Sequence, residues 1–413
     1  PFERERRSIW KRVALAKRDE VRSSAVLRYY GIALVAIHLL TLVYFARHDL
    51  LVRTITSETA VCWPFLPGCE AWRAQSARSV EASMVVYGVV AALAIVCFAR
   101  REHVGKALIG LACLDLIKAG WVLHDYRLMG NYHYMPFILT TAYLVLPAAK
   151  DVSRYLVVAF YVSAGVLKLD REWLSGAALI APTWLTGRWL ELGCALVVVL
   201  ELVVSLGLLV RARLVRWAAL VALAGFHLYS WHVVGFFYPL VMFALLAIFP
   251  LAWWVRPAPG AEPGIGPESL AARLVGGKAG WSVYAMLSVY GVAQLAPAMF
   301  PGDTAITGEG RMFSLNMMDA RVTCDHFSVA RLPNGSWREV SDLHPRVGVR
   351  IQCDPIRYVS LVREACEHAT TVSTYLTARR TTDASYQPVF AVDDACGLQF
   401  AVFSHNSWIG AHP

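Results

Sequence analysis

The chain has 413 residues, of which 57% are hydrophobic and only 17% are charged. Its mean hydropathy of +0.47 is well above that of an ordinary soluble domain and excludes a wholly water-soluble protein. The net charge of +9 does not indicate nucleic-acid binding, because basic loops beside membrane spans explain it more simply. We expect a polytopic α-helical membrane protein.

The first region, residues 1–25, is a basic segment in which Lys and Arg alternate with apolar residues such as Ile9, Trp10 and Val13. This pattern is typical of an interfacial helix on an anionic cytoplasmic leaflet. A solvated charged tail fits the same composition, so both interpretations stay open.

The second region, residues 26–300, contains nine apolar segments long enough to cross a hydrocarbon core of ~30 Å. They are 26–46, 82–99, 104–124, 134–149, 154–168, 188–210, 214–232, 236–255 and 280–300. The region 214–255 also fits one span and a re-entrant piece. Basic residues concentrate in alternate loops, which predicts a cytoplasmic N-terminus and an extracytoplasmic C-terminal region.

Cysteines test this orientation independently. Three of the nine fall inside predicted spans, whereas the other six fall on the predicted outer side, where an oxidising compartment permits disulfides. These six are Cys62, Cys69, Cys324, Cys353, Cys366 and Cys396. The spacing of Cys62 and Cys69 favours a loop staple over a redox or zinc site, and the sequence does not choose among the possible pairings.

The third region, residues 301–413, is predicted to be a small β-rich extracytoplasmic domain. Asn334-Gly335 separates two segments of strand character, which is a hairpin signal. RVGVRIQC alternates like a strand, Pro355 to Ala369 has a helical pattern, and PVFAVDDACGLQFAVF indicates a further strand pair.

Lys168 ends the fifth predicted span on the outer side, in the stretch FYVSAGVLKLDREWLSG. An ionisable group at membrane depth costs about 2.5–3.5 kcal/mol, so its presence needs a physical reason. The only other lysine predicted beyond the inner leaflet, Lys118, is explained by an ion pair with Asp115 on the same helix face. Burial favours the neutral amine, which can act as a general base or nucleophile. An ammonium group that extends to the lipid headgroups is the simpler alternative.

Other polar side chains are expected near the same outer ends of the spans. Asn131 and His133 open the fourth span, and His227 lies near the outer end of the seventh. Taken singly, each histidine also fits a hydrogen-bonded residue at the membrane interface. The histidines form no HxxxH or HxH pair beside a carboxylate cluster, so we predict no metal site.

Four blocks carry a likeness to a known family. YVSAGVLKLDREWLSGAAL closely resembles the fifth-span motif of the vitamin K-dependent γ-glutamyl carboxylases and their wider membrane-domain family, sometimes called HTTM. HDYRLMGNYHYM is similar to that family's D…N-N-H block. FHLYSWHVVGFFYPLVM is similar to its F-H-x-x-N…G-x-F-P segment, and RMFSLNMM to the F-S-W-x-M-M start of its lumenal domain. The likeness covers roughly residues 20–370.

The resemblance implies that a neutral Lys168, supported by His133, deprotonates reduced vitamin K or a related quinol. In this family, O2-dependent epoxidation of the quinol drives carboxylation by CO2 of glutamate in a secreted peptide or protein, a carbon–carbon lyase type of reaction that needs no metal. The matched positions that would contact the quinol are Asn131, Tyr132, His227 and Trp231.

The sequence departs from the family pattern at several positions. Tyr132 replaces the second asparagine of N-N-H, Leu167 replaces the first of two lysines, and Leu315 replaces the tryptophan of F-S-W. The asparagine after F-H-x-x is replaced by Ser230 or Trp231. The outer domain is also far smaller than in animal carboxylases, so quinol oxygenation could survive without carboxylation.

The alternative hypothesis is a member of the same membrane-domain family that binds a lipid or a partner. Such a protein would assist maturation or export of secreted peptides without carboxylation. Both hypotheses predict a multi-pass protein of the bacterial inner membrane that contacts membrane lipids and no nucleic acid.

Overall fold

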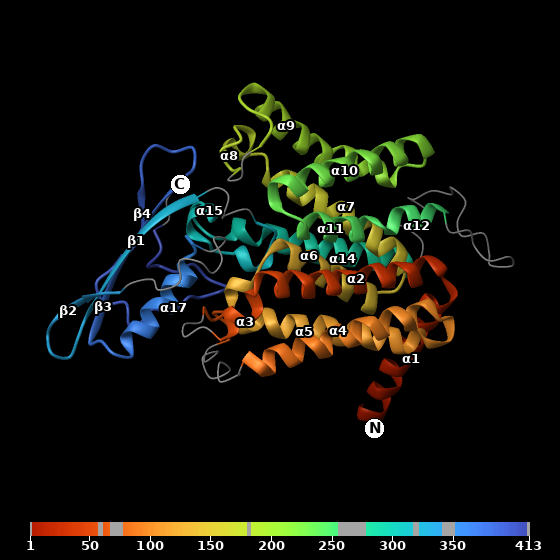
Figure 1. The fold of residues 1–413 in the computed structure, drawn as a ribbon, viewed down its shortest axis with the longest axis horizontal. Helices are drawn as coiled ribbons and strands as arrows, with labels where there is room; N and C mark the ends of the chain where they lie inside the picture. Colours follow the sequence, from red (N-terminus) through yellow and green to blue (C-terminus); the bar gives the residue numbers. More distant parts are fainter. Residues whose placement is uncertain are drawn as a thin grey trace.

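A computed structural model describes residues 2–56, 61–66, 77–179, 183–254, 278–316, 322–340 and 352–410. Long helices run side by side in a bundle, and a twisted sheet with one helix lies at one end of it (Figure 1). The N-terminal helix lies toward the opposite end of the bundle, and the C-terminus lies beside the sheet (Figure 1).

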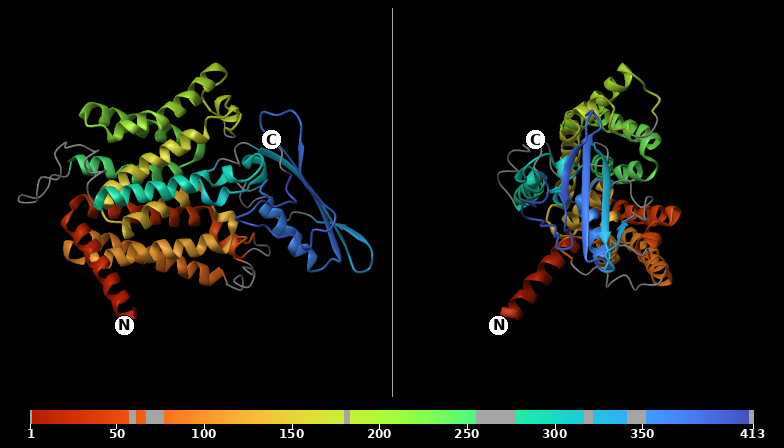
Figure 2. Two further views of the ribbon diagram at one scale, coloured as in Figure 1. Left: turned by 180° about the vertical axis from the view of Figure 1, so that it is seen from behind. Right: turned by 90° about the vertical axis from the view of Figure 1, so that its left-hand side faces the viewer.

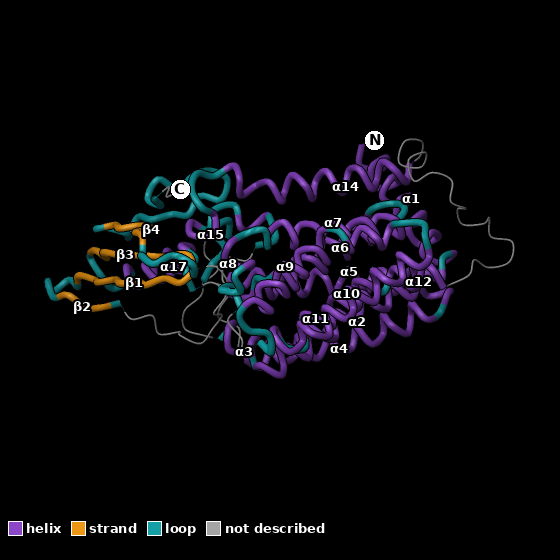
Figure 3. Tube along the Cα trace, turned by 90° about the horizontal axis from the view of Figure 1, so that it is seen from above, coloured by secondary structure: helices purple, strands orange, loops and turns teal. Residues whose placement is uncertain are grey.

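Most of the long helices run back and forth along the bundle, whereas the N-terminal helix projects from it at an angle (Figures 1 and 3). In chain order the helices are α1 (Phe2–Ser23), α2 (Ala25–His48), α3 (Leu50–Ile55), α4 (Ala77–Ala99), α5 (Val104–His124), α6 (Asn131–Val145), α7 (Ala149–Leu167), α8 (Arg171–Leu174), α9 (Arg188–Leu202), α10 (Arg213–Val234), α11 (Phe237–Leu246), α12 (Ile248–Trp254) and α14 (Lys278–Leu295). The view from behind shows α14 along α7, against which it packs (Figure 2).

Six helical stretches in the described residues are long and apolar enough to cross a membrane. They are Ala25–His48, Ala77–Ala99, Arg101–His124, Arg188–Leu209, Arg213–Val234 and Phe237–Trp254. The predicted number of nine is not confirmed, although the other three segments are helical too, as α6, α7 and α14. α6 has only 15 residues, fewer than the ~20 of a straight crossing. α7 carries Lys150, Asp151 and Arg154 in its first turns.

The exposed surface of these helices is apolar, as a lipid environment requires. On α4, Tyr87 and Phe98 are buried against the bundle, whereas Val85, Val89 and Leu93 are more than half exposed. Water would disfavour such a surface, but the hydrocarbon of a bilayer accepts it. The described helices therefore form a multi-pass membrane protein.

The basic segment at the start of the chain forms α1, and its last turns are fastened to the bundle. Lys17 donates a hydrogen bond to the carbonyl of Leu146, and Glu20 accepts one from the amide of Ala149 at 2.7 Å. Both acceptor and donor lie at the turn between α6 and α7. This end of the segment is thus not a solvated tail, while its contact with a leaflet stays a prediction.

The C-terminal domain is a four-stranded antiparallel sheet in the order β2-β1-β3-β4. Its elements are β1 (Val322–Arg331), β2 (Trp337–Glu339), β3 (Thr371–Arg380), β4 (Gln387–Val392) and the helix α17 (Pro355–Cys366). The predicted hairpin is confirmed, because Arg331 pairs with Trp337 around the turn at Gly335, whose φ is +82°. α17 lies within the helix predicted from Pro355.

The strand pair expected near the end of the chain is formed only in part. β4 ends at Val392, and the chain after it is held against β3 and α17, because Ala395 donates to the carbonyl of Val372 and Cys396 is bonded to Cys366. These contacts turn the chain back onto the domain. Of RVGVRIQC, only its last two residues lie within the described part, and they form a turn.

Four of the six outer cysteines pair within this domain, as Cys324–Cys353 and Cys366–Cys396. Cys62 is also in a disulfide, while Cys69 lies outside the described residues. The three cysteines expected to be plain thiols, Cys97, Cys113 and Cys194, are free.

A buried charge network fixes the domain to the bundle. Asp354, which caps α17, is fully buried and accepts from the Tyr126 hydroxyl at 2.8 Å and from Nη1 of Arg311 at 3.0 Å. Tyr126 follows α5, and Arg311 follows α14. Two bundle connections therefore meet the first turn of the domain helix.

We expect Arg311→Met to loosen this junction. Removing one partner of a buried ion pair leaves an uncompensated charge and destabilises a protein by about 3–5 kcal/mol. Thermal unfolding and protease release of the C-terminal domain would both begin at lower temperature than in the native protein. Arg338→Met, which changes an exposed arginine on β2, is the control, and equal stability of the two variants would contradict the role given to Arg311.

Candidate functional site

Lys168 lies at the end of α7 with its side chain turned into the protein. Its Nζ donates to both carboxylate oxygens of Glu201, at 2.8 and 2.6 Å, and to the carbonyl of Ala164 at 3.3 Å. Lys168 is 7% exposed and Glu201 is 1% exposed. The ammonium group thus reaches a carboxylate on α9 instead of the lipid headgroups.

A glycine lets the two helices come close enough for this pair. A Cβ atom at Gly165 of α7 would stand 2.7 Å from Cγ of Leu202 and 3.1 Å from Cβ of Glu201. Both distances are shorter than ordinary contacts between carbon atoms. The absence of a side chain at Gly165 is therefore what brings Glu201 within reach of Lys168.

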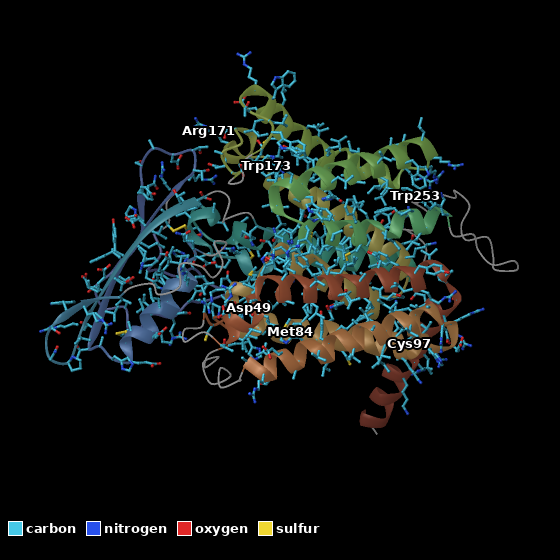
Figure 4. The ribbon with its side chains drawn as sticks, viewed as in Figure 1. Asp49, Met84, Cys97, Arg171, Trp173 and Trp253 are labelled. Atoms are coloured by element: carbon cyan, nitrogen blue, oxygen red, sulfur yellow. A yellow bond between two sulfur atoms is a disulfide. The ribbon has the colours of Figure 1, made fainter. Side chains whose placement is uncertain are left out.

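The short helix α8 follows Lys168 directly and lies over its ammonium group. Asp170 caps α8 by accepting from the amide of Trp173 at 2.6 Å, and the Trp173 indole donates to the carbonyl of Cys194 on α9 at 3.1 Å. The Trp173 ring is thereby held 5.1 Å from Nζ of Lys168, which is a cation–π distance. Arg171 and Trp173 lie where the bundle faces the sheet domain (Figure 4).

A buried tyrosine–histidine pair lies beside the ion pair. The Tyr161 hydroxyl is 2.6 Å from Nε2 of His227, and both side chains are buried. Tyr161 and Lys168 are seven residues apart and so share one face of α7. The charge of Lys168 acts on the imidazole of His227, and the charge of Glu201 acts on the hydroxyl of Tyr161. We call these four residues, Tyr161, Lys168, Glu201 and His227, the lysine cluster.

The other predicted site residues lie in two further places. His133 is buried among the rings of Phe45, Tyr132 and Phe237, with centroids 4.6–6.0 Å away. Trp231, on α10, is 43% exposed. His133 and Tyr132 thus form an aromatic group with α2 and α11.

Asn131 connects the start of α6 to the segment that follows α14. Its Nδ2 donates to the carbonyl of Asn316 at 2.8 Å, and Tyr134 on the same helix donates to the carbonyl of Phe313 at 2.6 Å. These acceptors belong to the block RMFSLNMM. The structure therefore brings together two of the four blocks that carry the family likeness, although they are far apart in sequence.

Sequence reasoning identified Lys168 and His227 but missed Glu201 and Tyr161. A signal for Glu201 exists, because it is a lone acid in the apolar run VVVLELVVSLG and a charged residue within a span usually has a partner. Tyr161 carries no comparable signal, since tyrosine is frequent in apolar helices.

The lysine cluster is linked to the C-terminal domain through the neighbour of Trp173. Glu172 accepts from Nη1 of Arg380 at 2.8 Å and from the Thr382 hydroxyl at 2.7 Å, and Arg380 also pairs with Asp303. Burial tends to raise the pKa of Glu172, but the hydrogen bonds from Thr382 and its own backbone, together with the charge of Arg380, hold the pKa below its usual value.

Comparison with known proteins gives no relative. No family model, no curated protein and no solved structure matches the chain. Among the described residues, no group of three or more His, Cys, Asp and Glu side chains is placed to hold a metal ion. The family likeness stays a prediction that depends on the four sequence blocks.

We expect Gly165→Val to force α7 and α9 apart and to weaken the Lys168–Glu201 pair. Overpacking of this kind destabilises by about 1–3 kcal/mol. The thermal unfolding midpoint of the purified protein should fall. Gly225→Val on α10 is the matched control, because a Cβ there would meet nothing within 4 Å. An equal fall in both variants would show that the close approach at Gly165 is not needed.

Acid should release α8 from the C-terminal domain. A carboxyl group whose pKa is lowered on folding stabilises above its unfolded pKa of about 4.3, and this contribution is lost as the pH falls through the folded pKa. Protection of the amides of α8 and of the end of β3, measured as exchange relative to the intrinsic rate at each pH, should therefore decrease as the pH falls from about 5 through the lowered pKa of Glu172. In Glu172→Gln the exchange should already be fast at neutral pH, whereas the exposed Glu339→Gln should behave as the native protein. A native-like acid profile in Glu172→Gln would contradict this assignment.

Proposed function

We propose that this protein is an integral membrane enzyme in which the lysine cluster deprotonates reduced vitamin K or a related quinol. Its activity would be that of a γ-glutamyl carboxylase-like enzyme, coupling quinol epoxidation by O2 to carboxylation by CO2 of glutamate in a secreted peptide or protein. One observation supports this above all: a buried lysine and a buried glutamate meet at the end of α7, beside Tyr161 and His227.

The chain is proposed to cross a bacterial inner membrane nine times. α6, α7 and α14 would be the crossings beyond the six long apolar helices, and the N-terminus would lie in the cytoplasm. Two disulfides in the C-terminal domain favour an oxidising, extracytoplasmic location for it. The lysine cluster, at the same end of the bundle, would then open toward the outer side.

The ion pair is chemically suited to work as one base. Two charges removed from water are held mainly by each other, and a proton can pass from Nζ to the carboxylate across 2.6 Å without movement of either group. This transfer leaves a neutral amine beside a neutral acid. The amine then accepts the proton of a ligand hydroxyl, while Glu201 retains the first proton.

The surrounding residues fit a ring that carries hydroxyl groups. When bound, a quinol supplies an acidic hydroxyl and the electrons that reduce O2. The buried Tyr161 and His227 offer hydrogen bonds, and Nδ1 of His227 has no hydrogen-bond partner among the described residues. The Trp173 ring limits the access of water to Nζ. His133 and Tyr132, with Asn131 and Trp231, are proposed to support and enclose the ligand from α6 and α10.

Lys168→Ala should abolish the reaction at its first step. Removing a positioned general base typically lowers a rate by 10²–10⁴-fold, so epoxide formation in membranes supplied with reduced vitamin K should fall by about that factor. Lys106→Ala, at an exposed lysine on α5, is the control for expression and membrane insertion. Unchanged epoxide formation in Lys168→Ala would remove the basis of the assignment.

Glu201→Gln should also impair epoxide formation, because the amide cannot take the proton of Lys168. We expect a loss of about 10²-fold, with the remaining activity coming from the amine alone. Glu191→Gln, an exposed position on the same helix, should retain native activity. If Glu201→Gln were fully active at neutral pH, Lys168 would act without its carboxylate partner.

The second candidate is a protein that binds a lipid or partner and assists maturation or export of secreted peptides without carboxylation. It is favoured by one observation, because Lys168 and Glu201 satisfy each other as a purely structural pair would. Replacing a buried pair by apolar residues of similar size is often neutral for stability.

The double variant Lys168→Met/Glu201→Leu separates the two candidates. The second candidate predicts no epoxide formation even in the native protein and a stable double variant that still supports peptide maturation or export. A catalytic pair predicts epoxide formation in the native protein and a stable double variant that forms none. Mass spectrometry for γ-carboxyglutamate on secreted proteins, with and without this chain, then tests carboxylation itself.

A further inference from the structure

A second buried lysine lies in the bundle, on a helix that contributes nothing to the lysine cluster. Lys118 and Asp115 are near the middle of α5 and are 2% and 5% exposed. The ion pair predicted between them is not formed as a hydrogen-bonded contact. Within the described residues, Nζ of Lys118 and Oδ1 of Asp115 have no hydrogen-bond partner.

These two atoms are a donor and an acceptor, and both are buried on one helix, three residues apart. Buried polar atoms are almost always satisfied, and an unpaired charge in a membrane interior is especially unfavourable. A lysine side chain is long enough to reach an acid three residues earlier on the same helix face. A donor and an acceptor held apart at this depth indicate that a third group belongs between them.

The surroundings define the chemistry of that group. A cation would be repelled by Lys118 and an anion by Asp115, so the group must be neutral and must both donate and accept a hydrogen bond. Next to the pair, His38 of α2 is 2.6 Å from the hydroxyl of Tyr87 on α4, so these two polar groups already satisfy each other. They lie within electrostatic range of Lys118 and Asp115, respectively.

A threonine at the surface of the bundle contacts the pair. The Thr141 hydroxyl of α6 donates to Oδ2 of Asp115 at 3.4 Å, and Thr141 itself is exposed. Asp115 is therefore one side chain away from the outside of the helices.

We propose that Asp115 and Lys118 form a binding site for a neutral hydroxyl group, whose oxygen accepts from Nζ of Lys118 and whose hydrogen is donated to Oδ1 of Asp115. The hydroxyl belongs either to a buried water molecule or to a membrane-soluble phenol or quinol. The site is separate from the lysine cluster and does not depend on the proposed enzymatic activity.

The test is an experimental structure of the full chain in lipid, at a resolution that shows ordered water. We expect density within about 2.7–3.2 Å of both Nζ and Oδ1. One sample is prepared as purified, one after exhaustive lipid extraction, and one after extraction with 1,4-naphthoquinol added. Compact density in all three samples identifies water. Density that disappears on extraction and returns as a ring with the naphthoquinol identifies a membrane-soluble hydroxyl compound.

Variants of the pair provide the control. Asp115→Asn and Lys118→Met should each lose the density, whereas Lys106→Met, an exposed lysine on the same helix, should keep it. A direct contact between Nζ and Oδ1 with no third group, or density unchanged in both variants of the pair, would overturn the assignment. If neither variant folds, the density in the native protein decides alone.

Discussion

An ammonium group and a carboxylate that have both left water hold α7 and α9 together at the end of the bundle that faces the sheet domain. The desolvation penalty of each ion is several kcal/mol, and only their mutual attraction and hydrogen bonds offset it. Glu201 receives both of its hydrogen bonds from Lys168, so neither residue is stable at its place without the other. This requirement fixes the distance between α7 and α9, and it explains why a residue without a side chain stands at Gly165.

Because the Lys168–Glu201 pair joins two helices, the sequence could predict its members only singly. A lysine at the end of an apolar run is visible in a single segment, and so is a histidine near the end of another. The partner of the lysine is 33 residues away on another helix, and the rotation of one helix against its neighbour is not encoded in either local pattern. Glu201 was therefore visible as an unusual acid but not as the counter-charge of Lys168. Asp115 and Lys118 show the converse, since their spacing on one helix predicted a contact that the side chains do not make.

The fold was predictable to the extent that it depends on local pattern. Apolar length located all nine helical segments, and Asn334-Gly335 located the hairpin, because both signals act within a few residues. Length did not decide how many segments cross a membrane, since α6 is short and α7 begins with charges that would lie at the membrane surface. The strand expected after β4 failed for a non-local reason. Its alternating pattern is real, but the bond between Cys396 and Cys366 draws the chain toward α17, and only the contact of Ala395 with Val372 stays on the edge of β3.

The short helix α8 places two adjacent residues against two different parts of the molecule. Trp173 lies over the ammonium group of Lys168, whereas Glu172 is held by Arg380 and Thr382 of the sheet domain. A helix of four residues has little stability of its own, so its position is set by these contacts and by the cap from Asp170. Any movement of β3 that draws Arg380 away also releases Glu172, and the ring beside it would then be held over Nζ only by the Asp170 cap and the hydrogen bond to Cys194. The position of the helix that covers the ion pair therefore depends on the C-terminal domain as well as on the membrane helices.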